Sequence, residues 1–413
     1  MDKTDIGWED VPIFDVASES ATPFYIFDAT KIRDRVQGLR DAFPKVELLY
    51  ALKANPNLEI ISLMNRETLV DGLDIASEGE LKLALRAGFE PQSLSLAGPA
   101  KTDGLLRAAI QSGVGCICVE SRLELEKIFS MGLSRSTQLM LRINPSEPIH
   151  AFQMKISGRP TPFGIDEEEL DGILGFWASH EYKSSFAGVH VHAGSQCFSA
   201  GAWARHIQKV FALAEYVSSF GLTVSTVNMG GGFGVSTWEP HVEASPKSIA
   251  GQLIRLRSKF SSAAVVRFEL GRYIMAPAGA FVTRVVSKKT SRGEKFLMLD
   301  GGTHQLFSAR HVGYQSRDIL VDNLSNPTGA LESWQMCGPL CTPEDRLGGR
   351  IDIHAPRIGD LLLFRNTGAY GLTMSPMFFL GHPTPKEILY DRGRWRTIRE
   401  SFSADCFWKA SEV

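Results

Sequence analysis

The chain has 413 residues, of which 44% are hydrophobic and 22% are charged, values typical of soluble globular proteins. Its 44 basic and 46 acidic residues leave a formal net charge of −2. The sequence therefore offers no positive field for nucleic acid or an anionic membrane, and we exclude both as partners. The six cysteines lack the spacing of a disulfide framework or a structural zinc site. With no long apolar run and no secretory signal, we expect a cytoplasmic protein.

Short apolar runs alternate with helix-like stretches between residues 30 and 275. Segments such as 78–88, 101–113 and 121–132 have helical periodicity. Eight apolar runs read as strands, at 46–52, 72–76, 93–98, 116–120, 139–144, 186–194, 223–230 and 264–271. This alternation predicts an α/β fold in which residues 30–275 form a (β/α)8 barrel of the TIM type.

The pattern changes after residue 275. Segments such as KFLMLDGG (295–302) and GDLLLFRNTGAYG (359–371) are short strand-like runs separated by Gly, Asp and Asn. This texture predicts an all-β domain over residues 276–413. The segment PFYIFD near the amino terminus also reads as a strand, so we assign residues 1–29 to the same domain.

Lys53 directly follows the first predicted barrel strand, in YALKAN. Active sites of such barrels lie at the carboxyl ends of the strands. We expect this lysine to be partly buried, which disfavours the ammonium form and makes the amine a better nucleophile toward an aldehyde. The alternative is a lysine whose stem packs at the strand end while its charge stays in water.

Two further strand ends carry unusual residues. The glycines of NMGGGFG (228–234) let backbone N–H groups approach a phosphate, although they also suit a tight barrel turn. In GVHVHAGSQ (188–196), the two-residue period places His190 and His192 on one face of a strand. With Glu269 they could bind a metal, or His192 could stack on a cofactor ring; a hydrogen-bonded core histidine is the preferred interpretation of His190.

Glu269 ends an apolar strand in FELGRY, and a buried carboxylate there needs a partner. A protonated pyridine nitrogen would supply one, and an ion pair with Arg272 is the alternative. Cys341, Asp345 and Tyr370 lie in the predicted β domain, where each taken alone is compatible with a purely structural role.

The order of these motifs resembles that of one enzyme family, the fold-type III decarboxylases that depend on pyridoxal 5′-phosphate (PLP), specifically the ornithine and diaminopimelate decarboxylase group. The motifs that carry the resemblance are YALKAN (50–55), LDIASEGEL (73–81), LRINP (141–145), PFGID (162–166), HVHAGSQ (190–196), NMGGGFG (228–234), ELGRY (269–273), GPLCTPED (338–345) and GAYG (368–371). The resemblance implies an alanine racemase-like fold, in which a barrel is joined to a β domain.

The resemblance also implies roles for individual residues. Lys53 would hold PLP as a Schiff base, His192 would stack on its ring, and Glu269 would contact the pyridine nitrogen. A glutamate at this point favours decarboxylation, because the alanine racemases have an arginine there. The cofactor phosphate would be held by Ser195, Gly231, Gly232, Gly271, Arg272 and Tyr370.

Three positions match residues that line and support the family's pocket, namely Asp74, Glu80 and Arg142. Cys341 matches a cysteine that reaches into the neighbouring subunit's active site and acts as an acid there. The resemblance therefore implies a homodimer with active sites shared across the interface.

Within the group, the carboxyl-terminal motifs and SGRPTPFGI (157–165) look most similar to decarboxylases of natural-product and siderophore biosynthesis, of the butirosin and staphyloferrin types. Family members that act on diamines carry an acid after the cysteine, whereas this chain has Thr342, which cannot pair with an ammonium. We therefore expect a modified or carrier-tethered amino acid as substrate. The candidate residues for its distal part are Arg142, Lys155, Arg159, Arg310, Thr342, Glu344 and Asp345.

Three alternatives stay open at this point: an ordinary diaminopimelate decarboxylase, a catalytically silent regulator that keeps the fold, and a metal-dependent hydrolase built on His190 and His192.

Overall fold

The computed structural model describes residues 7–134, 136–236, 243–260, 264–310 and 319–406. The chain divides into two compact units. One comprises Arg35–Val235 and Val242–Tyr273, and we call it the barrel unit. The other comprises Met1–Asp34, Ser236–His241 and Ile274–Val413, and we call it the β unit.

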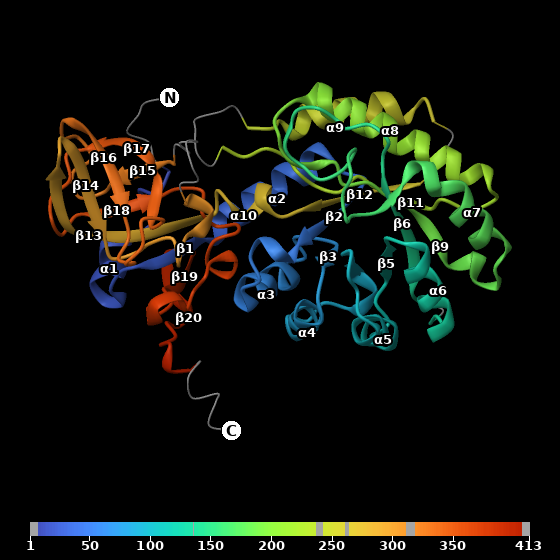
Figure 1. The fold of residues 1–413 in the computed structure, drawn as a ribbon, viewed down its shortest axis with the longest axis horizontal. Coiled ribbons are helices and arrows are strands. Elements are labelled where there is room, and N and C mark those ends of the chain that lie inside the picture. The colour runs from blue at the N-terminus through green and yellow to red at the C-terminus, as the bar shows by residue number, and fades with distance from the viewer. Residues whose placement is uncertain (1–6, 135, 237–242, 261–263, 311–318, 407–413) are drawn as a thin grey trace. The chain divides into compact units, whose positions relative to one another are not determined.

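Eight parallel strands of the barrel unit pair in the order β5-β4-β3-β2-β12-β11-β9-β6, and the pairing of β5 with β6 closes them into a ring (Figure 1). The strands are β2 (Val46–Ala51), β3 (Gly72–Ile75), β4 (Leu94–Leu96), β5 (Cys116–Val119), β6 (Gln138–Asn144), β9 (Phe186–His190), β11 (Thr226–Asn228) and β12 (Val265–Leu270). The predicted (β/α)8 barrel is thus confirmed, with each strand inside or within one residue of its expected range.

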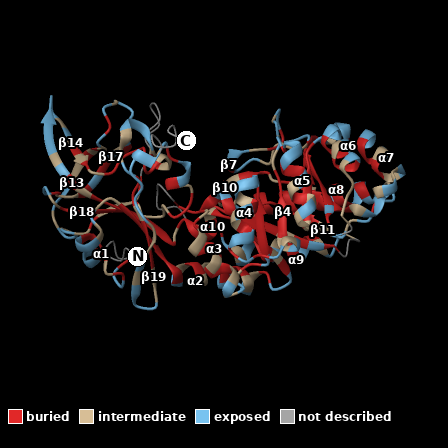
Figure 2. Cartoon of the chain, turned by 90° about the horizontal axis from the view of Figure 1, so that it is seen from below, coloured by how far each residue is buried: buried red, intermediate tan, exposed pale blue. Residues whose placement is uncertain are grey.

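Helices follow the barrel strands. They are α3 (Leu58–Arg66), α4 (Glu78–Arg86), α5 (Asp103–Ser112), α6 (Arg122–Met131), α7 (Leu170–Ser179), α8 (Ala200–Ser219), α9 (Pro246–Arg257) and α10 (Arg272–Met275), with α2 (Ala29–Ala42) before β2. Several begin at a side-chain cap; for example, the Ser77 and Ser121 hydroxyls accept hydrogen bonds from the N–H groups of Glu80 and Glu124. Their apolar faces cover the strands, which are buried (Figure 2).

Aromatic packing fixes the segment after β11 against the barrel wall. Phe233 lies 4.7 Å from the Trp203 ring of α8 and 5.3 Å from the Phe268 ring of β12, centroid to centroid, in edge-on geometry. All three side chains are almost completely buried. Such pairs stabilise a core beyond simple area burial, so the glycine-rich segment just before Phe233 has a rigid anchor.

The β unit contains a nine-stranded sheet in which β1 (Phe24–Asp28) pairs antiparallel with β13 and parallel with β19. The other strands are β13 (Gly279–Ser291), β14 (Glu294–Leu299), β15 (Val321–Asn323), β16 (Leu331–Cys337), β17 (Arg346–His354), β18 (Leu361–Phe364), β19 (Lys386–Asp391) and β20 (Arg394–Arg399), preceded by the helix α1 (Ile13–Ser20). An apolar cluster that includes Trp8, Phe24 and Leu363 forms part of its core. The predicted all-β character of this part is therefore confirmed.

None of the helices within the described ranges has both the length and the apolar character needed to cross a bilayer.

A buried histidine makes the stability of the barrel unit sensitive to acid. His206 on α8 is fully buried, and its Nε2 lies 2.8 Å from the Met229 carbonyl oxygen, so the neutral ring donates there. Burial lowers the pKa of His206 to about 4. Because an unfolded histidine titrates near 6.5, the unfolded chain binds the proton first, and stability falls as the pH drops from about 6.5 to about 4.

We expect His206→Gln, which keeps a donor for the Met229 carbonyl, to remove this dependence. The shift corresponds to at most about 3 kcal/mol at full protonation. Urea unfolding of the two proteins at pH 7.5 and near pH 4.5 measures the effect. Equal losses of stability in the wild type and the variant would contradict this role of His206.

Candidate active site

Lys53 and Asp74 form an ion pair at the carboxyl ends of β2 and β3. Lys53 lies on a single 3-10 turn, Leu52–Ala54, and its Nζ is 2.6 Å from Oδ2 of Asp74. The expected burial of Lys53 is wrong, because 51% of its side chain is exposed, whereas only 2% of the Asp74 side chain is. The ammonium is therefore presented at the open end of the barrel and held there by a buried acid.

Asp74 sits in an acidic environment. Burial raises its pKa, the nearby Glu269 raises it further, and the ion pair with Lys53 counteracts both effects. Its Oδ1 is buried and accepts no hydrogen bond from the described residues. Burial likewise raises the pKa of Glu80, although the Ala76 N–H donates to its carboxylate at 2.6 Å. The Asp74 Oδ1 beside the Lys53 amine is therefore an acceptor suited to a ligand that has a hydrogen-bond donor.

His192 lies outside the strand in which the sequence predicted it. β9 ends at His190, so the two histidines do not share a strand face, and His192 belongs to the following turn. Its Nδ1 accepts a hydrogen bond of 3.0 Å from the Gly231 N–H, which places the proton of the neutral ring on Nε2. Burial holds its pKa well below the usual value, and the positive charges of Arg142 and Lys53 contribute.

The three glycines after β11 permit close backbone contacts. A Cβ on Gly231 would lie 2.0 Å from the Glu269 carbonyl oxygen, and one on Gly232 would lie 2.1 Å from that of Gly194. Gly230 has φ +64° and packs against His192, where a Cβ would meet Nδ1 at 2.5 Å. These contacts support the tight-turn interpretation, and the phosphate-binding role of Gly231 and Gly232 stays a prediction.

Glu269 is held by side chains of two neighbouring strands. Nδ2 of Asn228 donates to its Oε1 at 2.6 Å, and Nε2 of His190 lies 3.4 Å from its Oε2. The ionisable side chain that lies beside the Glu269 carboxylate is thus His190. Asn228 was not predicted from the sequence; its signal was a polar residue at the end of an apolar strand.

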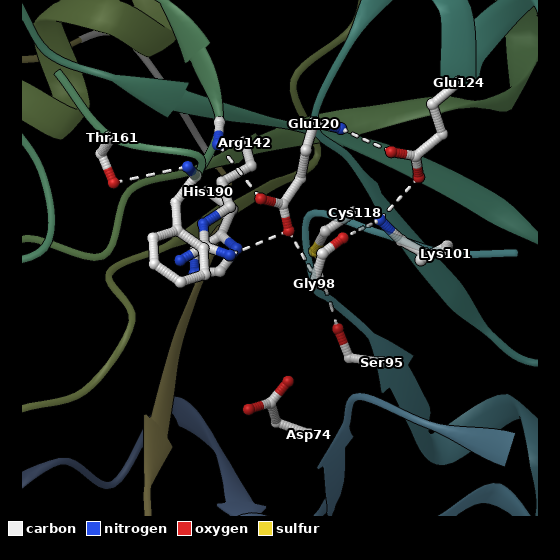
Figure 3. Close-up of polar contacts among 12 residues, drawn as sticks. Asp74, Ser95, Gly98, Lys101, Cys118, Glu120, Glu124, Arg142, Thr161 and His190 are labelled. Carbon is white, nitrogen blue, oxygen red and sulfur yellow. Dashed lines mark hydrogen bonds and ion pairs between the residues drawn. The ribbon is translucent and has the colours of Figure 1, made fainter.

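A second buried network, also missed, surrounds Arg142 on β6 (Figure 3). The Glu120 carboxylate accepts hydrogen bonds from Arg142 Nη1 at 2.8 Å, from the Gly98 N–H at 2.6 Å and from the Gly164 N–H at 3.1 Å. Behind it, Lys101 pairs with Glu124 at 2.6 Å. Although burial acts to raise the pKa of Glu120, Arg142 and Lys101 hold it below its usual value. The network fixes the guanidinium of Arg142 at the carboxyl end of β6.

Ser195 and Arg159 are linked through a two-stranded ribbon formed by β7 (Phe152–Lys155) and β10 (Gly194–Cys197). Ser195 pairs with Met154 in its register. Arg159 follows β7, is exposed, and donates from Nη2 to the Lys155 carbonyl at 2.6 Å. The ribbon and the segment that follows it thus contain a predicted cofactor contact, Ser195, and a predicted substrate contact, Arg159. A short strand, β8 (Ile165–Asp166), continues from the same segment and pairs with β6.

Gly271 and Arg272 directly follow β12 in the barrel unit, and the remaining predicted residues belong to the β unit. Cys341 is an exposed free thiol, Thr342 is half-buried, and Arg310 forms an ion pair with Glu344. Asp345 is 2% exposed, and its carboxylate accepts hydrogen bonds from the Thr303 and Leu340 N–H groups and the Thr303 hydroxyl. These contacts use its acceptors for loop structure and argue against the predicted contact with substrate. Tyr370 has φ +56°, a left-handed conformation uncommon outside glycine.

The arrangement does not favour the metal-site alternative. No group of three His, Cys, Asp or Glu side chains in the described part of the chain is arranged to hold a metal ion. His190 is directed to Glu269, whereas His192 accepts from Gly231, so the two rings do not converge on one point.

Known proteins share both the sequence pattern and the fold. The family model for the pyridoxal-binding domain of pyridoxal-dependent decarboxylases matches residues 29–276. The L-glutamyl-[BtrI acyl-carrier protein] decarboxylase of Niallia circulans is 34% identical over 403 residues, 93% of this chain and 92% of the relative. A 2-[(L-alanin-3-ylcarbamoyl)methyl]-2-hydroxybutanedioate decarboxylase of Staphylococcus aureus is 29% identical over 386 residues, 88% and 93% of the two chains.

Among solved structures, the diaminopimelate decarboxylase of Helicobacter pylori, in complex with L-lysine, matches with a TM-score of 0.85 at 25% identity, covering 97% of this chain and 99% of the other. The chain therefore belongs to the pyridoxal-dependent decarboxylase family. Its relatives are carboxy-lyases that act on amino acids or their derivatives, so the predicted family and enzyme class are confirmed.

The glycine contacts give a test of the turn. We expect Gly231→Ala to destabilise the barrel unit by about 2–3 kcal/mol, because the added methyl meets a backbone oxygen that cannot move aside. Gly251→Ala, on the exposed face of α9 with nothing within 4 Å of the added methyl, is the matched control and should stabilise by about 0.5–1 kcal/mol. Urea unfolding measures both variants; a Gly231→Ala protein as stable as the wild type would contradict the packing described.

Proposed function

We propose that this chain is a PLP-dependent decarboxylase of a conjugated amino acid, with Lys53 as the residue that binds the cofactor aldehyde as a Schiff base. The observation that carries the proposal is the Lys53–Asp74 pair at the barrel mouth, with Glu269 close enough to raise the pKa of Asp74. Because the Lys53 amine is exposed and only its Asp74 partner is buried, the amine can move from the carboxylate to a carbonyl group while the backbone stays in place.

The residues present fit PLP. Oδ1 of Asp74 accepts no hydrogen bond from the described residues, burial favours the neutral His192 ring, and Glu269 offers a carboxylate between Asn228 and His190. When bound, PLP would supply an electron sink for the bond that loses CO2. His192 would pack on the ring face, and Glu269 would accept a hydrogen bond from the protonated ring nitrogen. Donors of Ser195, Gly231, Gly232, Gly271, Arg272 and Tyr370 would hold the phosphate.

The proposed substrate is an amino acid joined to another group, in natural-product or siderophore biosynthesis. Two relatives support this: one is named for a glutamyl group on an acyl-carrier protein and the other for an alanine–citrate conjugate. Thr342 provides no charge for the second amine of a diamine. The exposed Arg159, with Lys155 beside it, and Arg142, whose Nη1 donates to Glu120, are the cations proposed for the distal part.

We further propose a cytoplasmic homodimer. Residues 30–275 would form the PLP-binding barrel, and residues 1–29 with 276–413 would form the β domain that completes the partner's site. Cys341, exposed and free, is the proposed acid that returns a proton to the substrate after CO2 leaves. Arg310, Thr342 and Glu344 would lie near the distal end of the substrate.

The attachment of PLP to Lys53 gives the first test of this function. Borohydride reduction of the cofactor-loaded protein should leave a mass adduct on the peptide that contains Lys53, and Lys53→Ala should lose both the adduct and turnover. Lys82→Ala, which removes a lysine paired with Glu78 on the surface of α4, is the control and should keep both. A colourless wild-type protein without an adduct would refute the proposal.

The identity of residue 342 gives a test of the substrate class. We expect the wild type to release CO2 from glutamyl carrier protein or an amino-acid–citrate conjugate with a kcat/KM roughly 100-fold above that for meso-diaminopimelate, because an unpaired ammonium costs about 3 kcal/mol at such a site. Thr342→Glu should lower the ratio of kcat/KM for the conjugated substrate to kcat/KM for meso-diaminopimelate. Efficient turnover of free meso-diaminopimelate by the wild type would instead favour the lysine-biosynthesis alternative.

A further inference from the structure

Each oxygen of the Glu269 carboxylate has its own side-chain neighbour. Its two carboxylate oxygens face different partners, Asn228 at 2.6 Å and His190 at 3.4 Å, and these come from β11 and β9. The exposed fractions of Glu269, Asn228 and His190 are 7%, 0% and 1%. The three side chains are therefore shielded from bulk solvent, and the orientation of the carboxylate depends on the two side chains beside it.

Asn228 can contact Glu269 in only one orientation. Its Oδ1 accepts the Gly230 N–H at 2.9 Å, so its Nδ2 must face Glu269. Turning the amide over would place the NH2 group against a backbone N–H and the carbonyl oxygen against the carboxylate, which are both repulsive. Asn228 therefore acts as a fixed donor and couples Glu269 to the first residue of the glycine turn.

His190 occupies the other side of the carboxylate. It is the last residue of β9, is paired in register with Asn228, and interacts electrostatically with Cys118 and Asp74 of other barrel strands. Neither ring nitrogen makes a hydrogen bond with a described residue at the present geometry. The Glu269 oxygen 3.4 Å away is the acceptor that a small rotation of the ring would reach.

We propose that Asn228 and His190 are positioning residues, which keep the Glu269 carboxylate as a hydrogen-bond acceptor directed at the ring nitrogen of the bound cofactor. The proposal rests on the PLP function above. It assigns a role to two residues that were not expected to contact the cofactor. Without the Asn228 hydrogen bond and the polar His190 ring, Glu269 would face the buried acid Asp74 with less compensation, and its carboxylate would no longer be directed at the ring nitrogen.

The titratable groups around His190 come from several elements. They are Glu269 on β12, Asp74 on β3, Cys118 on β5, His192 in the turn after β9 and His206 on α8. Burial lowers the pKa values of His192 and His206, which favours their neutral forms at pH 7.

The sharpest variant is Asn228→Asp, which keeps the shape and the oxygen that accepts the Gly230 N–H but replaces the donor to Glu269 by a second acid. His190→Phe removes the polar ring on the other side of the carboxylate, and His190→Gln puts an amide donor there. His206→Gln is the control, because it changes a buried histidine of the same barrel that contacts the Met229 carbonyl rather than Glu269.

Each variant is loaded with PLP, checked for folding by circular dichroism, and examined for kcat, KM and the absorbance of the bound cofactor from pH 5 to 9. Asn228→Asp and His190→Phe should still give the borohydride adduct on Lys53. Their kcat should fall roughly 10- to 100-fold, because Asn228→Asp loses the hydrogen bond to the Glu269 carboxylate and His190→Phe loses the polar group on its other side, with KM changed less than about twofold.

The spectroscopic change separates positioning from simple structural damage. The acidic limb of the kcat–pH profile and of the cofactor absorbance should move to higher pH in Asn228→Asp and His190→Phe. His190→Gln and His206→Gln should follow the wild type. Folded, loaded Asn228→Asp with wild-type kcat and an unchanged absorbance profile would overturn the proposal, whereas failure of the wild type itself to take up PLP would overturn the proposed function instead.

Discussion

A carboxylate inside a barrel is stable only when cations or fixed donors surround it, and this requirement organises the site. The parallel strands direct their carboxyl ends to one mouth, which brings Asp74 and Glu269 close enough to raise the pKa of Asp74. Each acid then needs its own compensation. Asp74 is paired with Lys53, and Glu269 is held by Asn228 and His190. The positions of Lys53, Asp74 and Glu269 thus depend on one another through their charges.

The glycine turn connects this arrangement to the barrel wall. Gly230 donates to Asn228 and Gly231 donates to His192, so two consecutive N–H groups orient the side chains on either side of the site. Phe233, packed among aromatic rings, prevents the turn from shifting as a whole. Backbone and side chains therefore position each other, which explains why a methyl group at Gly231 would disturb more than its own contacts.

Much of this could be predicted from the sequence. The strand periodicity predicted the barrel, and the positions of Lys53 and Glu269 at strand ends indicated them as candidate active-site residues. The partners were not predictable, because Asn228 meets Glu269 through strand pairing that no local pattern encodes, and Glu120 joins segments far apart in the chain. The exposure of Lys53 was misjudged for a related reason: the strand ends two residues earlier, so a turn rather than the pleat decides where its side chain lies.

The ribbon of β7 and β10 has a consequence for how this enzyme can diverge. Phe152 is buried while the next three residues of β7 are exposed, and the opposite strand contains Ser195. Exchanges at those three exposed positions would change the exposed side chains of the ribbon, while Phe152 and the main-chain pairing keep the strand in place. One strand of the ribbon can therefore vary in sequence without disturbing the neighbouring one.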